Sequence, residues 1–122
     1  MFSPSPRLDG KSLAFFFRQL GMLLTSGVPL VQAWKLLTAD MKKKRRQALH
    51  TAALHMEQGI RPSLAMSRCQ AFPSLACRLI EAGEQTGNLD TICLVLADFY
   101  TRADKDRRVL FEALAYPVFL LV

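Results

Sequence analysis

NLDTICLVLADFYTRA, residues 88–103, has the clearest helical pattern of the sequence. Asn88 is a good N-cap, because its side-chain oxygen can accept a hydrogen bond from a backbone N–H group of the first turn. Apolar residues then recur every three or four positions, as on one helix face: Leu89, Ile92, Leu96, Phe99 and Ala103. The stretch therefore predicts a helix that buries this face and meets no helix breaker before Pro117.

The overlapping residues 81–90, EAGEQTGNLD, indicate a tight corner between two helices. Gly87 can adopt the left-handed conformation that ends a helix. Glu84 lies in a last turn, where its charge meets the negative end of the helix dipole. We expect its carboxylate to accept hydrogen bonds from the start of the helix after the corner, or to pair with a nearby Arg or Lys. Calcium ligation by Glu84 and Asp90 is the alternative, although no D-x-D-x-D-G loop surrounds them.

Glycine and proline divide the earlier sequence into five further helical segments. Gly27 and Gly59 are suited to end helices, and Pro29 is suited to open one. With helical spacing throughout and no alternating strand pattern, the predicted fold is an all-α bundle of six helices. The expected helices cover residues 11–25, a segment from Pro29, one from its N-cap Asp40 to Gly59, one from Pro62, one from Pro73 to residue 86 and one from Asn88.

Composition limits the classes of protein to which the chain can belong. Its 122 residues, 51% of them hydrophobic, suffice for one core and one domain. The net charge of +6 permits an anionic partner without selecting one. Cys69, Cys77 and Cys93 form no C-x-x-C pair and no even set, so we expect no disulfide framework and a reducing compartment.

The last ten residues, 113–122, contain nine apolar residues and Pro117. As a helix they would be about 15 Å long, roughly half of a bilayer core. Basic residues precede them, as the positive-inside rule expects on the cytoplasmic side of a membrane span; these are Arg102, Lys105, Arg107 and Arg108. We expect the first part of a transmembrane helix, with a terminal core helix as the alternative.

No combination of residues predicts catalysis. His50 and His55 are five positions apart, which places them about 140° from each other around a helix. Zinc-ligand, nucleotide-binding and nucleophile motifs are absent from the sequence. We therefore predict a protein that is not an enzyme and that uses no cofactor.

The basic run KKKRR consists of Lys42, Lys43, Lys44, Arg45 and Arg46. A solvated helix face is the first interpretation, and a docking surface for an acidic protein or for lipid headgroups is the second. DNA contact ranks third, because no aromatic residues are interleaved for base stacking. At a helix start these cations would lie at the unfavourable end of the helix dipole.

Phe15, Phe16 and Phe17 are consecutive, so one helix stripe cannot bury all three. We expect at least one of them to contact another chain, a lipid or another part of a longer protein. Trp34 is predicted to be a core anchor. The exposed phenylalanine surface and the apolar tail together predict self-association, as a dimer or a larger assembly.

Four segments, taken in order, resemble the F domain of inner-membrane platform proteins from type II secretion and type IV pilus systems. They are FFFRQLGMLLTSGVPLVQAWKLL, LHMEQGIRPSLAM, FPSLACRLIEAGEQTGNLD and LADFYTRADKDRRVLFEALAYPVFLLV. The resemblance covers about residues 12–122. It implies a leader of residues 1–10, a cytoplasmic helical domain of residues 11–112 and the start of a first transmembrane helix at residues 113–122. The residues expected to shape this fold or its contacts are Gly27, Pro29, Gly59, Pro73, Gly83, Glu84, Gly87, Asn88, Tyr116 and Pro117.

The resemblance also implies a function. Such proteins form the base, on the bacterial inner membrane, to which pilin or pseudopilin subunits are added or from which they are removed. A separate cytoplasmic ATPase is coupled to that base, and no nucleic acid is implied as a partner. The leader is shorter here than in many relatives, so contacts made through it are not predicted. A basic helical DNA-binding or regulatory domain is the alternative, prompted by the charge of +6 and the run KKKRR.

Overall fold

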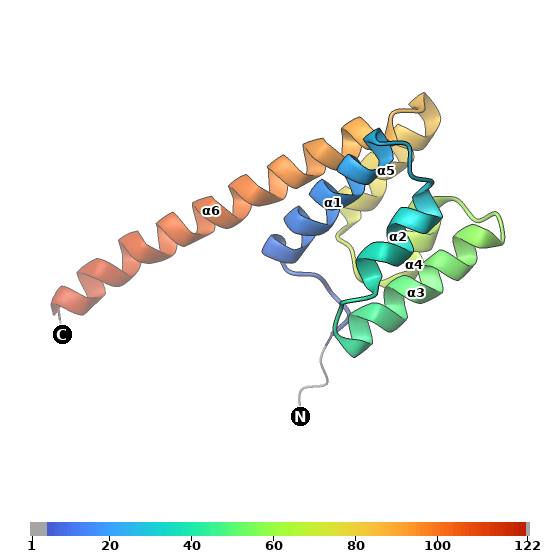
Figure 1. The fold of residues 1–122 in the computed structure, drawn as a ribbon. Coiled ribbons are helices and arrows are strands. Elements are labelled where there is room, and N and C mark those ends of the chain that lie inside the picture. Colours follow the sequence, from blue (N-terminus) through green and yellow to red (C-terminus); the bar gives the residue numbers. More distant parts are fainter. Residues whose placement is uncertain (1–4, 122) are drawn as a thin grey trace.

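The computed structural model describes the backbone of residues 5–121 and the side chains of residues 5–106. Within this range the protein has six helices and no strand, which confirms the all-α prediction. The helices are α1 (Gly10–Thr25), α2 (Leu30–Thr38), α3 (Lys43–Glu57), α4 (Pro62–Cys69), α5 (Ser74–Thr86) and α6 (Leu89–Leu121), as Figure 1 shows.

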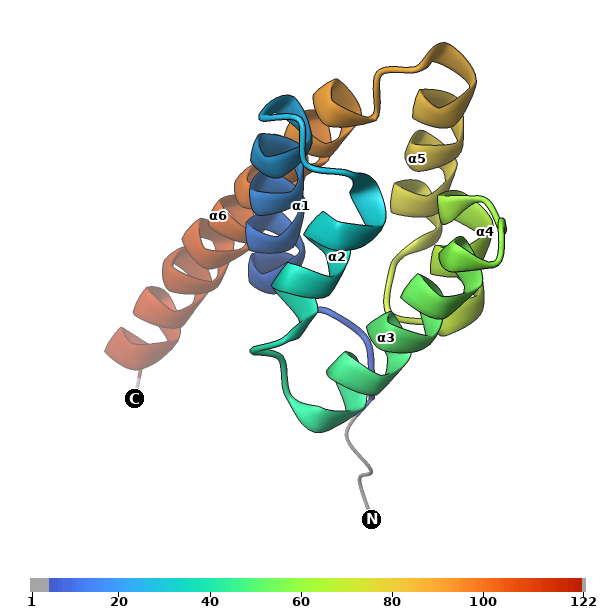
Figure 2. The same ribbon diagram turned by 45° about the vertical axis from the view of Figure 1, so that its right-hand side comes forward.

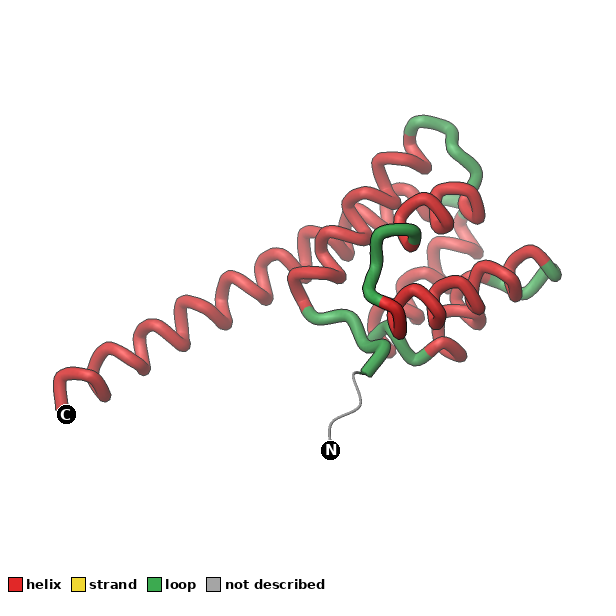
Figure 3. The backbone as a smooth tube through the Cα atoms, turned by 60° about the horizontal axis from the view of Figure 1, so that its bottom comes forward, coloured by secondary structure: helices red, strands yellow, loops and turns green. Residues whose placement is uncertain are grey.

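The helices close into a ring. Each packs against the next in sequence, and α6 returns to pack along α1 in the most extensive contact of the fold. The two run antiparallel, because Gly21 near the end of α1 lies against Leu94, whereas Gly10 lies opposite Asp104. Past the contact of Asp104 with Gly10 at the start of α1, α6 leaves the bundle and continues alone (Figures 1 and 3).

The helix ends follow the glycine and proline signals. Gly27, Gly59 and Gly87 have positive φ angles of 94°, 91° and 74°, and Pro29 and Pro73 are the N-caps of α2 and α5. The prediction of Asp40 as an N-cap was wrong, since α3 begins at Lys43 after Lys42. The reason is a turn that closes α2, in which the Met41 N–H donates to the Thr38 carbonyl at 3.2 Å.

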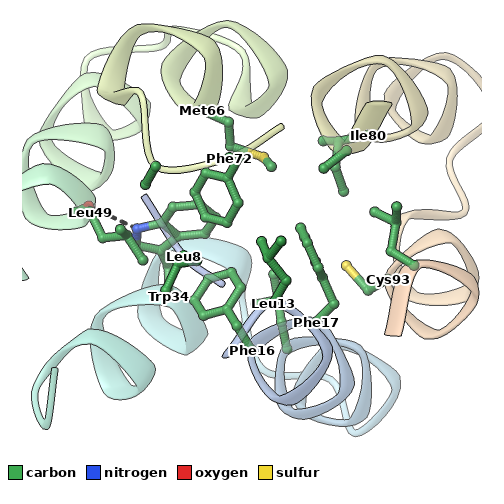
Figure 4. Packing of buried hydrophobic residues seen from close by; sticks show 14 of the residues in the cluster. Leu8, Leu13, Phe16, Phe17, Trp34, Leu49, Met66, Phe72, Ile80 and Cys93 are labelled. Carbon is green, nitrogen blue, oxygen red and sulfur yellow. Dashed lines mark hydrogen bonds between the residues drawn. The ribbon is translucent and has the colours of Figure 1, made fainter. Parts of the chain in front are cut away.

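The core is organised around Trp34, which is buried as predicted. Its indole Nε1 donates to the Leu49 carbonyl of α3 at 2.8 Å, and its ring lies edge-on to Phe16 of α1. Phe72, from the segment between α4 and α5, packs against Trp34 and Phe17 (Figure 4). Side chains from α1, α2 and the segment before α5 thus meet at the centre of the ring.

α6 turns a different face to the core from the one predicted. Its buried residues are Cys93, Leu96, Ala97 and Tyr100. Phe99 was assigned to the buried stripe but is 48% exposed. Apolar residues occupy every position from 92 to 97, so the spacing fits two neighbouring stripes equally well. The contact with α1 selects between them, because Gly21 allows α6 to approach closely along the line of Cys93.

The last part of α6 carries two of the residues predicted to shape the fold. The helix continues through Tyr116 and Pro117, whose side chains lie outside the described residues. In the part of the chain that the structure describes, no helix combines the length and the apolar character that a bilayer crossing requires.

Candidate functional site

The carboxylate of Glu84 caps the start of α4. Ser63, in the first turn of α4, donates its backbone N–H to Oε1 at 2.5 Å and its hydroxyl to Oε2 at 2.9 Å. The expectation that Glu84 would cap the helix after the corner was wrong, because α5 packs against α4 and brings its last turn to that helix start. The negative charge is stabilised there by the positive end of the α4 dipole.

The same geometry argues against calcium at Glu84. Both carboxylate oxygens already accept hydrogen bonds from Ser63, so the position of Glu84 is explained without a cation. Asp90 lies in the first turn of α6. Among the described residues, His, Cys, Asp and Glu form no group of three that could hold a metal ion.

The corner between α5 and α6 depends on two glycines. Gly87 donates its N–H to the Gly83 carbonyl at 2.8 Å and takes the left-handed conformation that ends α5. A Cβ on Gly83 would meet Ile92 at 3.0 Å and Leu89 at 3.1 Å. Asn88 occupies the position before α6, and its side-chain oxygen accepts from the Thr86 hydroxyl. These residues make the corner a structural element.

Arg45 differs from the other members of the basic run. Its guanidinium donates to the Ser12 hydroxyl and to the Arg7 carbonyl, both at 3.2 Å, and lies 3.7 Å from the Asp9 carboxylate. Arg45 therefore joins α3 to the segment that leads into α1. This role could not be predicted from sequence spacing, because the partners lie more than 30 positions away.

The other four basic residues of the run, Lys42, Lys43, Lys44 and Arg46, are exposed. Three of them occupy the start of α3, whose first turn contains no acidic residue and whose N-cap makes no side-chain hydrogen bond. Positive charges at this end of a helix oppose its dipole. The run thus presents a concentrated cationic surface at a cost to the local helix.

The three phenylalanines separate as the sequence predicted. Phe16 and Phe17 are buried, whereas Phe15 is 66% exposed. Phe15 borders a groove of about 400 Å³ between α1 and the segment linking α2 to α3. Leu37 and Met41 are part of its apolar lining, and its charged lining consists of Lys11, Asp40, Lys42 and Arg45.

Exposed apolar side chains also occur on α1 and α6. They are Met22 on α1 and Val95 and Phe99 on α6, each about half exposed. The side chain of Arg18 crosses between the helices beside them, and its guanidinium donates to Asp98 Oδ1 at 3.0 Å. We call this set the α1–α6 outer face. Sequence spacing missed it because Phe99 was placed in the core.

The cysteines are not poised for chemistry. Burial raises the pKa of Cys93 to about 12, and it also raises the pKa values of Cys69 and Cys77. At neutral pH these side chains are therefore thiols, and the thiolate is the form that attacks or binds metal.

Comparison with known proteins gives a consistent result. A family model described as Type II secretion system (T2SS), protein F, matches residues 16–122. The chain is 34% identical to the type IV pilus assembly protein PilC of Thermus thermophilus, over 92% of this chain and 28% of that protein. It is 36% identical to the protein transport protein HofC homolog of Escherichia coli, over 96% and 30%. It is 32% identical to the type II secretion system protein F of Vibrio cholerae, over 90% and 28%. The chain thus spans less than a third of the length of these relatives.

Proposed function

The chain belongs to the family of type II secretion system protein F, and on this premise we propose that it is the cytoplasmic domain of an inner-membrane assembly platform. The platform would support the addition or removal of pilin or pseudopilin subunits, driven by a separate ATPase. The observation that carries the proposal is the extent of the family match, which includes α6 and nearly all of the bundle.

The course of α6 supports a membrane-anchored domain. The helix packs along α1 up to Asp104 and then leaves the bundle (Figure 1). Its direction carries residues 113–121, which belong to the most apolar part of the sequence, away from the folded domain. We place the start of the first transmembrane helix in that segment and the six-helix bundle on the cytoplasmic side.

Fractionation of the full-length gene product from its host tests the proposal. We expect the protein in the membrane fraction, resistant to high salt and released by detergent. Deletion of the gene should abolish surface pili or the export of a secreted protein. A gene product that stays in the soluble fraction and sediments with DNA would instead support the alternative of a DNA-binding domain.

Self-association is the second part of the proposal, and the α1–α6 outer face is its candidate surface. Val95 and Phe99 lie one turn apart on α6, and each is about half exposed. Sedimentation of the chain in a mild detergent should show a dimer or a larger species, and the variant Val95→Glu/Phe99→Glu should be monomeric. Leu54→Glu, at an exposed residue of α3, is the control and should associate like the wild type.

A further inference from the structure

The end of the bundle from which α6 departs is strongly basic. Arg45 ties the start of α3 to the start of α1, and the start of α1 lies against Asp104 of α6. Figures 1 and 2 show the starts of α1 and α3 at the same end of the bundle. The exposed basic residues in these segments are Arg7, Lys11, Lys42, Lys43, Lys44, Arg46, Arg102 and Lys105. They outnumber the acidic residues of the same segments that lie outside the Arg45 contact, Asp40, Asp104 and Asp106.

The opposite end carries carboxylates. Glu57 ends α3, Glu81 and Glu84 lie in the second half of α5, and Asp90 opens α6. Basic residues balance part of this charge, since Lys35 forms an ion pair with Glu57 and Arg61 precedes α4. Basic residues are in clear excess only at the end of the bundle toward the projecting part of α6. We call that end the basic end-face, defined by the eight exposed basic residues.

We propose that the basic end-face docks on anionic phospholipid headgroups of the membrane that α6 enters. This inference rests on the proposed function, in which the membrane span begins near residue 113. Asp104 is nine helical steps from residue 113, so the end-face would lie about 14 Å from the hydrocarbon core. The headgroup layer is roughly 5 to 8 Å thick on each side. The remaining gap is comparable to the Debye length of about 8 Å at physiological salt.

Two features of the end-face fit a lipid surface. Lys42, Lys43 and Lys44 oppose the dipole of α3, so their charges are not explained by the stability of that helix. The groove beside them is lined by apolar side chains and by three basic residues against one carboxylate, Asp40, and the exposed Phe15 borders it. A membrane interface offers the same combination of anionic headgroups and adjoining hydrocarbon.

The test measures how the chain partitions onto two kinds of vesicle, pure phosphatidylcholine and a mixture of phosphatidylcholine with phosphatidylglycerol. Binding to neutral vesicles measures the contribution of the apolar tail. The ratio of anionic to neutral binding measures the contribution of the end-face. Lys43→Gln/Lys44→Gln should reduce this ratio roughly 30-fold, since each lysine near an anionic surface contributes roughly fivefold. The matched control Arg61→Gln/Arg78→Gln removes the same charge from exposed residues outside the end-face and should change the ratio much less.

The outcomes separate the inference from the proposed function. If neutral vesicles do not bind the chain while binding to the anionic vesicles still depends on Lys43 and Lys44, the docking stands and the membrane span does not. Equal losses in both double variants would mean that net charge alone governs binding and would overturn the docking, as would a ratio that neither variant changes. Circular dichroism checks that each variant is folded. Independently of any variant, the ratio for the wild type should fall to near one at about 1 M salt, where the Debye length is about 3 Å.

Discussion

The helices α3 and α4 begin in opposite electrostatic settings. At the start of α4, both carboxylate oxygens of Glu84 accept hydrogen bonds from Ser63, which is buried. At the start of α3, three exposed lysines face a helix end that has no acidic residue in its first turn. The first arrangement satisfies free N–H groups and the helix dipole, and the second opposes the dipole.

This difference indicates that the start of α4 is a structural site, whereas the residues at the start of α3 serve a purpose other than stability. Ser63, at the start of α4, is buried, and its N–H group without an acceptor would lose its hydration with no hydrogen bond in return. The start of α3 faces solvent, where lysines are tolerated although a helix would be more stable without them. Local stability therefore explains the residues at the start of α4. It does not explain those at the start of α3, which we attribute to binding of a partner.

The largest effect that we predict is at the start of α4. Glu84→Ala removes the acceptor of two hydrogen bonds and leaves the N–H and hydroxyl of Ser63 without their partner. Bonds to a charged group are the stronger class, so we expect a loss of about 2 kcal/mol in the free energy of unfolding. Urea denaturation followed by circular dichroism measures it.

Two further variants sharpen this result. Glu84→Gln keeps an acceptor without the charge and should lose about 1 kcal/mol. Glu81→Ala, at an exposed residue one turn earlier in α5, should be close to neutral. If the wild type and Glu84→Ala were equally stable, the Glu84 cap would not stabilise the start of α4. A melting temperature that falls with chelator in the wild type but not in Glu84→Ala would restore the calcium alternative.

The sequence predicted the fold well because its signals are local. Gly27, Gly59 and Gly87 end helices through backbone conformations that depend on neighbouring residues alone. The partner of Glu84 could not be predicted in the same way, since Ser63 lies 21 positions away and only the packing of α5 on α4 brings them together. The role of Arg45 could not be predicted for the same reason, because its partners are also distant in sequence.

The second prediction concerns the support of the basic end-face. Arg45→Ala removes hydrogen bonds to Ser12 and to the Arg7 carbonyl, so the segment before α1 loses its tie to α3. We expect a loss of about 1 kcal/mol in unfolding free energy, together with faster amide hydrogen exchange at the start of α1. Arg46→Ala, at the exposed neighbour, is the control. If both variants are equally stable, Arg45 contributes no more to the stability of the fold than the solvent-exposed lysines of the run.

The third prediction has the opposite sign. Lys43→Gln removes a cation from the first turn of α3, where it opposes the dipole, and should stabilise the protein by about 0.5 kcal/mol at low salt. The gain should shrink as salt is added. Lys105→Gln, within α6, is the matched control and should change little. Destabilisation by Lys43→Gln would show that the lysine supports the fold. The start of α3 would then be explained by local stability, as the start of α4 is.

The smallest effect is a dependence on pH at the start of α1, next to the same surface. Asp9 is the N-cap of α1, and hydrogen bonds from Ser12, together with the charge of Arg45, lower its pKa below 3.8. A carboxyl group whose pKa is lowered by folding stabilises the protein above its unfolded pKa and loses that contribution as the pH falls through the folded value. Asp9→Asn keeps the cap without the charge, so the wild type should be more stable by roughly 0.3 kcal/mol at pH 7, a small value because the side chain is exposed. Thermal melts of the two proteins between neutral and acid pH should show this advantage disappear toward pH 3. If the wild type stayed more stable than Asp9→Asn at low pH, the difference would come from the geometry of the cap and not from the charge of Asp9. Arg45 would then support the end-face only through its hydrogen bonds to Ser12 and Arg7.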